Sequence, residues 1–143
     1  MLDGGYGMKK VFGVVAGIFV AFLLVAASDG ISSALFPLVD VDTADPSVLA
    51  AYIAAMPIAA KLIVATGWLI APLAGAWLAL RIADWVPGGW IVTVVFLAAG
   101  VMNQFALPHP LWMQVCAVGL PLLGGWAAER IHRKPYPGEP LLG

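Results

Sequence analysis

Long runs of apolar residues dominate the chain and are separated by short polar segments. Four runs are long enough to cross a bilayer as helices, because about 20 helical residues span the roughly 30 Å hydrocarbon core. They cover residues 11–36, 58–80, 90–107 and 111–128. Only Pro108, His109 and Pro110 separate the last two, which predicts a tight hairpin there. The pattern therefore predicts an all-α membrane protein, a bundle of four transmembrane helices.

Residues 37–57 form the longest polar segment, between the first two predicted spans. Within it, Asp45 followed by Pro46 has the pattern of a helix N-cap and a first helical residue. Five apolar residues then recur at the spacing of one helix face: Val48, Leu49, Tyr52, Ile53 and Met56. The pattern predicts a short amphipathic helix on the outer membrane surface. The alternative is a simple extension of the span at 58–80.

Composition agrees with a membrane protein and narrows the classes of function. The 143 residues are 62% hydrophobic and 10% charged, and the mean hydropathy is +0.97. An ordinary soluble domain is about half apolar and a quarter charged. A net charge of −1 provides no basic surface for nucleic acid. The single cysteine, Cys116, cannot form an internal disulfide or a multi-cysteine metal site, and no metal or cofactor is expected.

The positions of the lysines and arginines predict the orientation in the membrane. Cationic residues are retained on the cytoplasmic side. Six of the seven fall at one end of the predicted bundle: Lys9, Lys10, Arg81, Arg130, Arg133 and Lys134. We therefore expect a cytoplasmic N-terminus at residues 1–10 and a cytoplasmic, extended tail at 129–143, so that both termini face inward.

An alternative interpretation concerns the first apolar run. Read from Met8, two lysines, an apolar run and the small residues 25–27 would resemble a secretory signal peptide. The run continues past Ala27 to Phe36, however, which favours a membrane span.

The ends of the second and fourth spans resemble each other. Residues 72–82 and 121–131 are identical at seven of eleven positions without gaps. Inward-going helices often end in small residues, an interfacial Trp and an Arg, but this does not explain Pro and Gly at the same offsets. We therefore expect two helical hairpins that are parallel repeats about an axis along the membrane normal. Pro72 and Pro121 would kink their helices near mid-membrane.

Small residues recur every four positions on the first two spans. They are Gly13 and Gly17 on the first, and Gly67, Ala71, Gly75 and Ala79 on the second. Such spacing lets helix backbones approach closely in lipid. The contact could lie within the bundle or at a homodimer face.

The strongly polar residues of the spans fall in one layer near the outer boundary of the hydrocarbon core. They are Asp29, Lys61, Asn103, Gln104 and Gln114, with His109 capping the layer. Ionisable groups within a span are costly unless paired or wetted, so the layer is either a ligand site or a set of structural interhelical bonds. Asp29 and Lys61 are the expected ion pair, because they have opposite charges at matched depth.

The chain resembles a group of small bacterial four-span proteins. The resemblance rests on a first helix that ends at Pro37, an outer Asp-Pro loop, and the turn from His109 to Trp112, with the sequence His-Pro-Leu-Trp. The resemblance implies a four-helix fold in a bacterial inner membrane, and it implies no particular activity.

Three functions remain open. The expected one is a non-enzymatic accessory or scaffold subunit that packs laterally in a larger membrane complex of the respiratory or photosynthetic type. The alternative is a small transporter or lipid-like ligand-binding protein, whose outer-facing site is the polar layer. A membrane enzyme would need an acid–base pair within reach, which only Asp29 and His109 could supply. Expected partners are the lipid bilayer and either protein subunits or a second copy.

Overall fold

The computed structural model describes residues 3–37 and 44–132, and these contain five helices and no strand. The helices are α1 (Asp3–Leu35), α2 (Pro46–Ala55), α3 (Ile58–Ala83), α4 (Val86–Ala106) and α5 (Leu111–His132). All but α2 are long and apolar enough to cross a membrane. The all-α class is thereby confirmed, and each of the four predicted spans is a helix that could cross a membrane.

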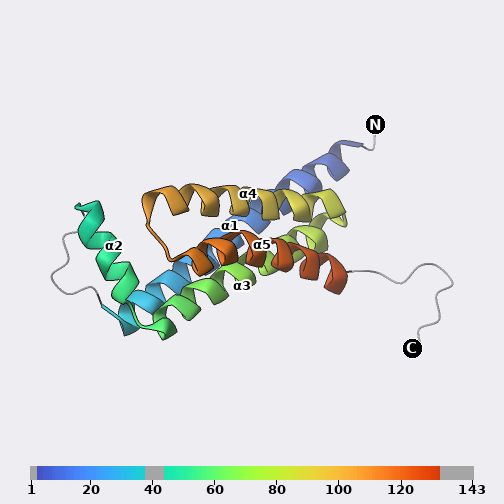
Figure 1. The fold of residues 1–143 in the computed structure, drawn as a ribbon. Helices are drawn as coiled ribbons and strands as arrows, with labels where there is room; N and C mark the ends of the chain where they lie inside the picture. The colour runs from blue at the N-terminus through green and yellow to red at the C-terminus, as the bar shows by residue number, and fades with distance from the viewer. Residues whose placement is uncertain (1–2, 38–43, 133–143) are drawn as a thin grey trace, which may run out of the picture.

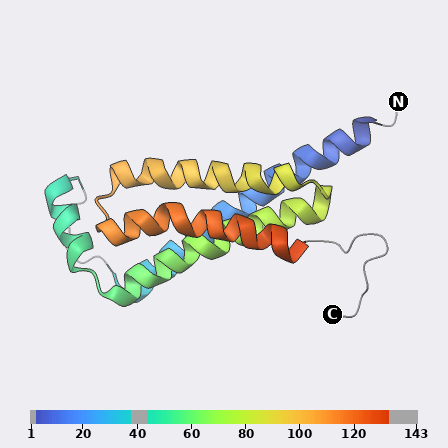
Figure 2. The same ribbon diagram turned by 45° about the vertical axis from the view of Figure 1, so that its right-hand side comes forward.

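The four long helices lie side by side as a bundle, and α2 lies across one end of it (Figures 1 and 2). The start of α1 and the end of α5 are at the opposite end. Helix α3 is central, because it packs against α1, α4 and α5. Helix α4 also contacts α1 and α5. We call the two ends of the bundle the α2 end and the terminal end.

Several helices extend beyond their predicted bounds. Helix α1 starts at Asp3 rather than residue 11, and Lys10 within this extension lies 4.3 Å from the ring centre of Tyr6 and 4.9 Å from that of Trp85. These cation–π contacts stabilise the added turns. Helix α4 starts at Val86 rather than residue 90, because a proline is tolerated in the first turn of a helix.

Helix α5 also continues past residue 128, as far as His132. The first residues of the predicted extended tail are therefore helical. Arg130 lies in the last turn, where a cationic group complements the helix dipole. The prolines that predicted an extended tail lie outside the described residues, as do Arg133 and Lys134.

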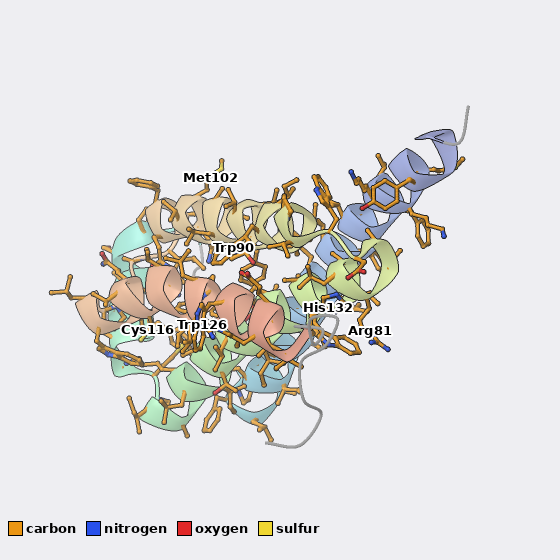
Figure 3. All side chains as sticks on the ribbon, turned by 90° about the vertical axis from the view of Figure 1, so that its right-hand side faces the viewer. Arg81, Trp90, Met102, Cys116, Trp126 and His132 are labelled. Atoms are coloured by element: carbon orange, nitrogen blue, oxygen red, sulfur yellow. The ribbon has the colours of Figure 1, made fainter. Side chains whose placement is uncertain are left out.

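Side-chain bonds tie the helices together at the terminal end. Asp84, in the α3–α4 turn, has a positive φ of 49° and donates its backbone N–H to Leu80. Its carboxylate accepts a 2.9 Å bond from Nε2 of His132. Between α4 and α5, Nε1 of Trp90 donates to Glu129 at 2.9 Å, and Figure 3 shows this tryptophan between the two helices.

Small residues allow close contact between α1 and α3. A Cβ atom built on Gly17 would collide with the carbonyl oxygen of Gly75, and a Cβ on Gly75 would collide with that of Gly17. One turn away, a Cβ on Gly13 would lie 3.1 Å from the carbonyl oxygen of Ala79. Gly67 faces Ser28 in the same interface. The predicted small-residue stripes thus lie between helices of one chain.

Helix α5 approaches α3 closely at Pro72, which lacks the backbone N–H of a regular helical residue. A Cβ on Gly124 would lie 2.6 Å from the carbonyl oxygen of Leu69 and 3.2 Å from the ring of Pro72. Pro72 and Pro121 are both fully buried, in helices that continue past them. The prolines therefore serve as packing surfaces inside the bundle, and Ala71 is buried beside them.

The exterior of the bundle is apolar. Phe19 on α1, Met102 and Phe105 on α4, and Val115 on α5 are all exposed, and Figure 3 shows Met102 pointing away from the other helices. Large apolar side chains are favourable there only if lipid or another protein covers them. This surface suits a membrane protein.

Candidate functional site

Helix α2 is a separate element, and its local sequence explains where it starts and ends. The Asp45 carboxylate accepts bonds from the backbone N–H of Ser47 at 2.8 Å and from its hydroxyl at 2.7 Å. These bonds lower the pKa of Asp45. The helix ends at Ala55, and Pro57 precedes the start of α3. The predicted N-cap is confirmed, and the alternative of one continuous helix is wrong.

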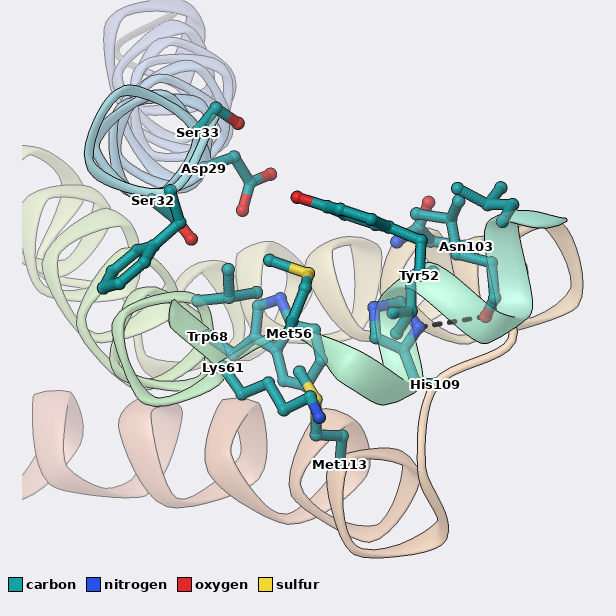
Figure 4. Close-up of a pocket in the computed structure, with 15 residues that line it drawn as sticks. Asp29, Ser32, Ser33, Tyr52, Met56, Lys61, Trp68, Asn103, His109 and Met113 are labelled. Carbon is teal, nitrogen blue, oxygen red and sulfur yellow. Dashed lines mark hydrogen bonds between the residues drawn. The ribbon is translucent and has the colours of Figure 1, made fainter. Parts of the chain in front are cut away.

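Beneath α2 lies a cavity of about 280 Å³, shown in Figure 4. All five helices and the α4–α5 turn contribute to its wall. The lining residues are Asp29, Ser32, Ser33, Phe36, Leu49, Tyr52, Ile53, Met56, Lys61, Val64, Trp68, Asn103, Leu107, His109 and Met113. The predicted apolar face of α2 therefore covers the cavity, with the exception of Val48. Apolar walls with a few convergent polar groups are typical of a small-molecule site.

Lys61 is buried, with 8% of its surface exposed, and its ammonium group donates to the Ala54 carbonyl at 2.9 Å. That carbonyl belongs to the last turn of α2, where backbone oxygens lack partners within the helix. Lys61 thereby connects α3 to the end of α2. Its charge also complements the negative end of the helix dipole.

The expected ion pair between Asp29 and Lys61 is not formed among the described residues. The carbonyl of Ala54, seven residues away in sequence, occupies the ammonium group instead. Figure 4 shows the Asp29 carboxylate directed into the cavity on the side of Tyr52, while Lys61 extends away from it. Within the described part of the chain, no hydrogen bond or ion pair reaches the Asp29 carboxylate.

His109 is held in place by a hydrogen bond of its ring, a contact with an aromatic ring and a bond to its backbone. Its Nδ1–H donates to the Leu107 carbonyl at 3.0 Å, and its ring meets that of Trp68 edge-on, with centres 5.7 Å apart. The backbone carbonyl of His109 accepts a 2.8 Å bond from the amide of Gln114. Burial lowers the pKa of His109, and the bond to Leu107 opposes part of that effect.

The lowered pKa of His109 predicts a pH dependence of stability. Because the folded protein favours the neutral ring, the unfolded chain takes up the proton first, near pH 6.5. Stability should therefore be complete above that pH and decrease as the pH falls through it. We expect thermal unfolding in detergent to shift downward from about pH 7.5 to about pH 5.5. His109→Gln should reduce this shift, and an equal shift in the variant would contradict the prediction.

The structure brings together only part of the predicted polar layer. Asn103 lines the cavity with Asp29, Lys61 and His109, whereas Gln104 and Gln114 do not line it. Gln104 is the next residue on α4, so its side chain points about 100° away around the helix. Both polar atoms of its amide are buried with no partner among the described residues. Gln114 supports the turn that holds His109.

Sequence reasoning did not identify Trp68 or Met113 as part of the site. Tryptophans of membrane proteins concentrate at the membrane–water interfaces. Trp68 lies within α3, away from its ends, and this unusual position was a weak indication that it belongs to a site. Met113 carries no signal of its own in the sequence.

A second cavity, of about 240 Å³, adjoins the first. Both are lined by Asp29, Trp68 and Asn103. The remaining walls of the second cavity are apolar and lie nearer the middle of the bundle: Phe22, Val25, Phe96, Ala99, Gly100 and Ala117. The rings of Phe22 and Phe96 are 5.8 Å apart. The two cavities therefore share a polar wall, and the second extends from that wall between apolar side chains.

In the part of the chain that the structure describes, no three His, Cys, Asp or Glu residues are grouped as metal ligands would be. No protein-family model, curated protein or solved structure matches this chain.

Proposed function

We propose that this protein is a non-enzymatic membrane protein that binds a small amphipathic molecule in the cavity beneath α2. The observation that supports this most directly is the combination of apolar walls with a carboxylate, that of Asp29, which no described group pairs. A polar layer with only a structural role would be expected to pair its charges across helices, and Asp29 makes no such pair among the described residues. Its carboxylate is exposed, so it is accessible to a ligand in the cavity.

We further propose that the membrane is a bacterial inner membrane and that both termini are cytoplasmic. The cavity then faces outward, because it lies at the opposite end of the bundle from the start of α1 and the end of α5. The described cationic residues at the terminal end, Lys9, Lys10, Arg81 and Arg130, support this orientation. A ligand would accordingly enter from the outer leaflet or from the space beyond it.

The bundle is also proposed to derive from two parallel helical hairpins. Arg81 lies 5.6 Å from the ring centre of Trp77, and Arg130 lies 5.2 Å from that of Trp126. These pairs alone are common at the inner ends of membrane helices. The repeat is supported by Pro72 and Pro121, which are both fully buried, and by Gly75 and Gly124, which each lie against a carbonyl oxygen of a neighbouring helix. The contact between α3 and α4 has no counterpart between α1 and α5, so packing in the two halves is not the same.

Binding can be tested with long-chain amphiphiles that carry bromine, which quenches tryptophan fluorescence at contact. Brominated dodecylamine, dodecanol and dodecanoic acid would be titrated into phosphatidylcholine nanodiscs that contain the protein. At least one should quench wild-type fluorescence saturably, and Trp68→Phe should remove that quenching because Trp68 lines both cavities. Empty nanodiscs provide the background.

A matched pair of variants tests the location. Ser33 lines the cavity, whereas its exposed neighbour Ala34 does not. Ser33→Phe should abolish the saturable quenching by filling the cavity, and Ala34→Phe should leave it unchanged. If none of the three amphiphiles quenches saturably, or if both variants behave as wild type, ligand binding in this cavity is contradicted.

A second candidate function is that of an accessory subunit in a larger complex, or of a homodimer. Phe12, Val15, Phe19 and Leu23 are exposed at helical spacing along α1. This stripe could contact a partner helix as well as lipid. Gentle solubilisation followed by size analysis tests it. Migration of the protein alone, as a monomer, would contradict both a partner subunit and a homodimer.

A further inference from the structure

We infer that the ligand is a single-chain amphiphile with a cationic amine headgroup, which binds with its ammonium group at Asp29 and its chain in the second cavity. This inference rests on the proposed function and adds the sign of the charge and the direction of the chain. Three features support it: which charged side chains line both cavities, which residues the two cavities share, and which residues form the remaining walls of the second cavity.

The sign of the charge follows from the partners of the groups that line the cavities. Lys61 already donates to the end of α2, and Nδ1–H of His109 already donates to Leu107. In the described chain, Asp29 is the acidic residue that lines both cavities, and nothing described bonds to its carboxylate. Asp29 is exposed, whereas Lys61 lines only the first cavity and places one of its three ammonium donors on Ala54. A headgroup at the wall that both cavities share therefore meets a carboxylate and no cationic side chain among the described residues, which favours a cation.

The position of the headgroup follows from the junction of the cavities. Asp29, Trp68 and Asn103 line both, so a group placed between the compartments meets all three. An ammonium group there could donate to the carboxylate and to the amide oxygen of Asn103. The indole ring of Trp68 offers a cation–π surface beside them. Figure 4 shows the Asp29 carboxylate directed into the first cavity.

The direction of the chain follows from the walls of the second cavity. Below the junction these walls are apolar, and Ala99, Gly100 and Ala117 leave the space open because their side chains are small. Phe22 and Phe96 border it with their rings. A narrow hydrocarbon chain fits such a space, and its burial is favourable because it leaves water. A compact cation without a chain would leave the second cavity empty.

The charge is tested with the brominated amphiphiles already described, which share one chain and differ in headgroup. In the wild-type protein we expect brominated dodecylamine to bind about tenfold more tightly than brominated dodecanol, since a hydrogen bond between two charged groups is stronger than one from a neutral hydroxyl. The brominated acid should bind more weakly than both. Asp29→Asn, which preserves the shape of the side chain, should lower amine affinity to the level of the alcohol.

The chain is tested with a second matched pair on α4. Ala99 lines the second cavity, whereas its exposed neighbour Ala98 does not. Ala99→Phe should remove most of the affinity difference between brominated dodecylamine and brominated butylamine, because only the longer chain reaches that space. Ala98→Phe should preserve the difference. A difference that survives in Ala99→Phe would place the chain elsewhere and overturn this part of the inference.

The outcomes separate the inference from the proposed function. Saturable quenching that is equal for amine and alcohol, or that favours the acid, would overturn the cationic headgroup while leaving amphiphile binding in place. Absence of saturable quenching by all three would contradict the proposed function itself. Retained alcohol binding shows that Asp29→Asn is folded. If that variant does not fold, the headgroup comparison in the wild-type protein still decides the sign of the charge.

Discussion

Gly17→Ala should lower the free energy of unfolding by about 3 kcal/mol, because overpacking at a close contact typically costs 1–3 kcal/mol. The added Cβ would collide with the carbonyl oxygen of Gly75 and lie 2.9 Å from a methyl group of Val92. A backbone carbonyl cannot move aside as a flexible side chain can. Helices α1 and α3 would have to separate along their interface. A titration with denaturing detergent, followed by circular dichroism, measures the loss.

Gly30→Ala is the matched control on the same helix. A Cβ built at Gly30 has nothing within 4 Å, so no contact is strained. Alanine favours a helix over glycine by about 1 kcal/mol, so this variant should be as stable as the wild type or slightly more stable. If Gly17→Ala were equally well tolerated, the close approach of α1 and α3 would not contribute to stability.

Lys61→Met should release the end of α2 while retaining most of the aliphatic packing of the side chain. The variant loses the bond from the ammonium group to Ala54, and bonds to charged groups contribute about 1.5–3 kcal/mol. Because the loss is local, hydrogen exchange of the α2 amides should accelerate about tenfold or more. The exchange of α3 and α5 amides should change much less.

Lys9→Met provides the control for loss of a positive charge. Lys9 is exposed on α1, at the terminal end and far from α2, so its removal should leave α2 exchange unchanged. Equal α2 exchange in Lys61→Met and the wild type would show that Lys61 does not hold α2. Lys61→Met should also weaken binding in the cavity, because the cover of the cavity would be displaced.

Particular residues show how far the sequence predicted the site. Four of the predicted polar residues do line the cavity, because residues at similar depth on adjacent helices meet when the helices pack. The pairing of Lys61 was not predicted correctly, because the orientation of α2 determines whether a carbonyl or a carboxylate is nearer. Asn103 and Gln104 were also indistinguishable by depth, and only the rotation of α4 separates them.

The sequence by itself determined the four long helices, the N-cap of α2, and the location of the start of α1 and the end of α5 at one end of the bundle. These depend on the length of apolar runs, on the number of crossings and on bonds between neighbouring residues. Only the tertiary structure decided that the small-residue stripes join α1 to α3, that α2 closes a cavity, and that Asp29 has no partner among residues 3–37 and 44–132. Those properties depend on the rotation and crossing of whole helices, which no local pattern specifies. The polar layer read from the sequence is thus divided into a cavity lining, a supporting amide and a buried amide.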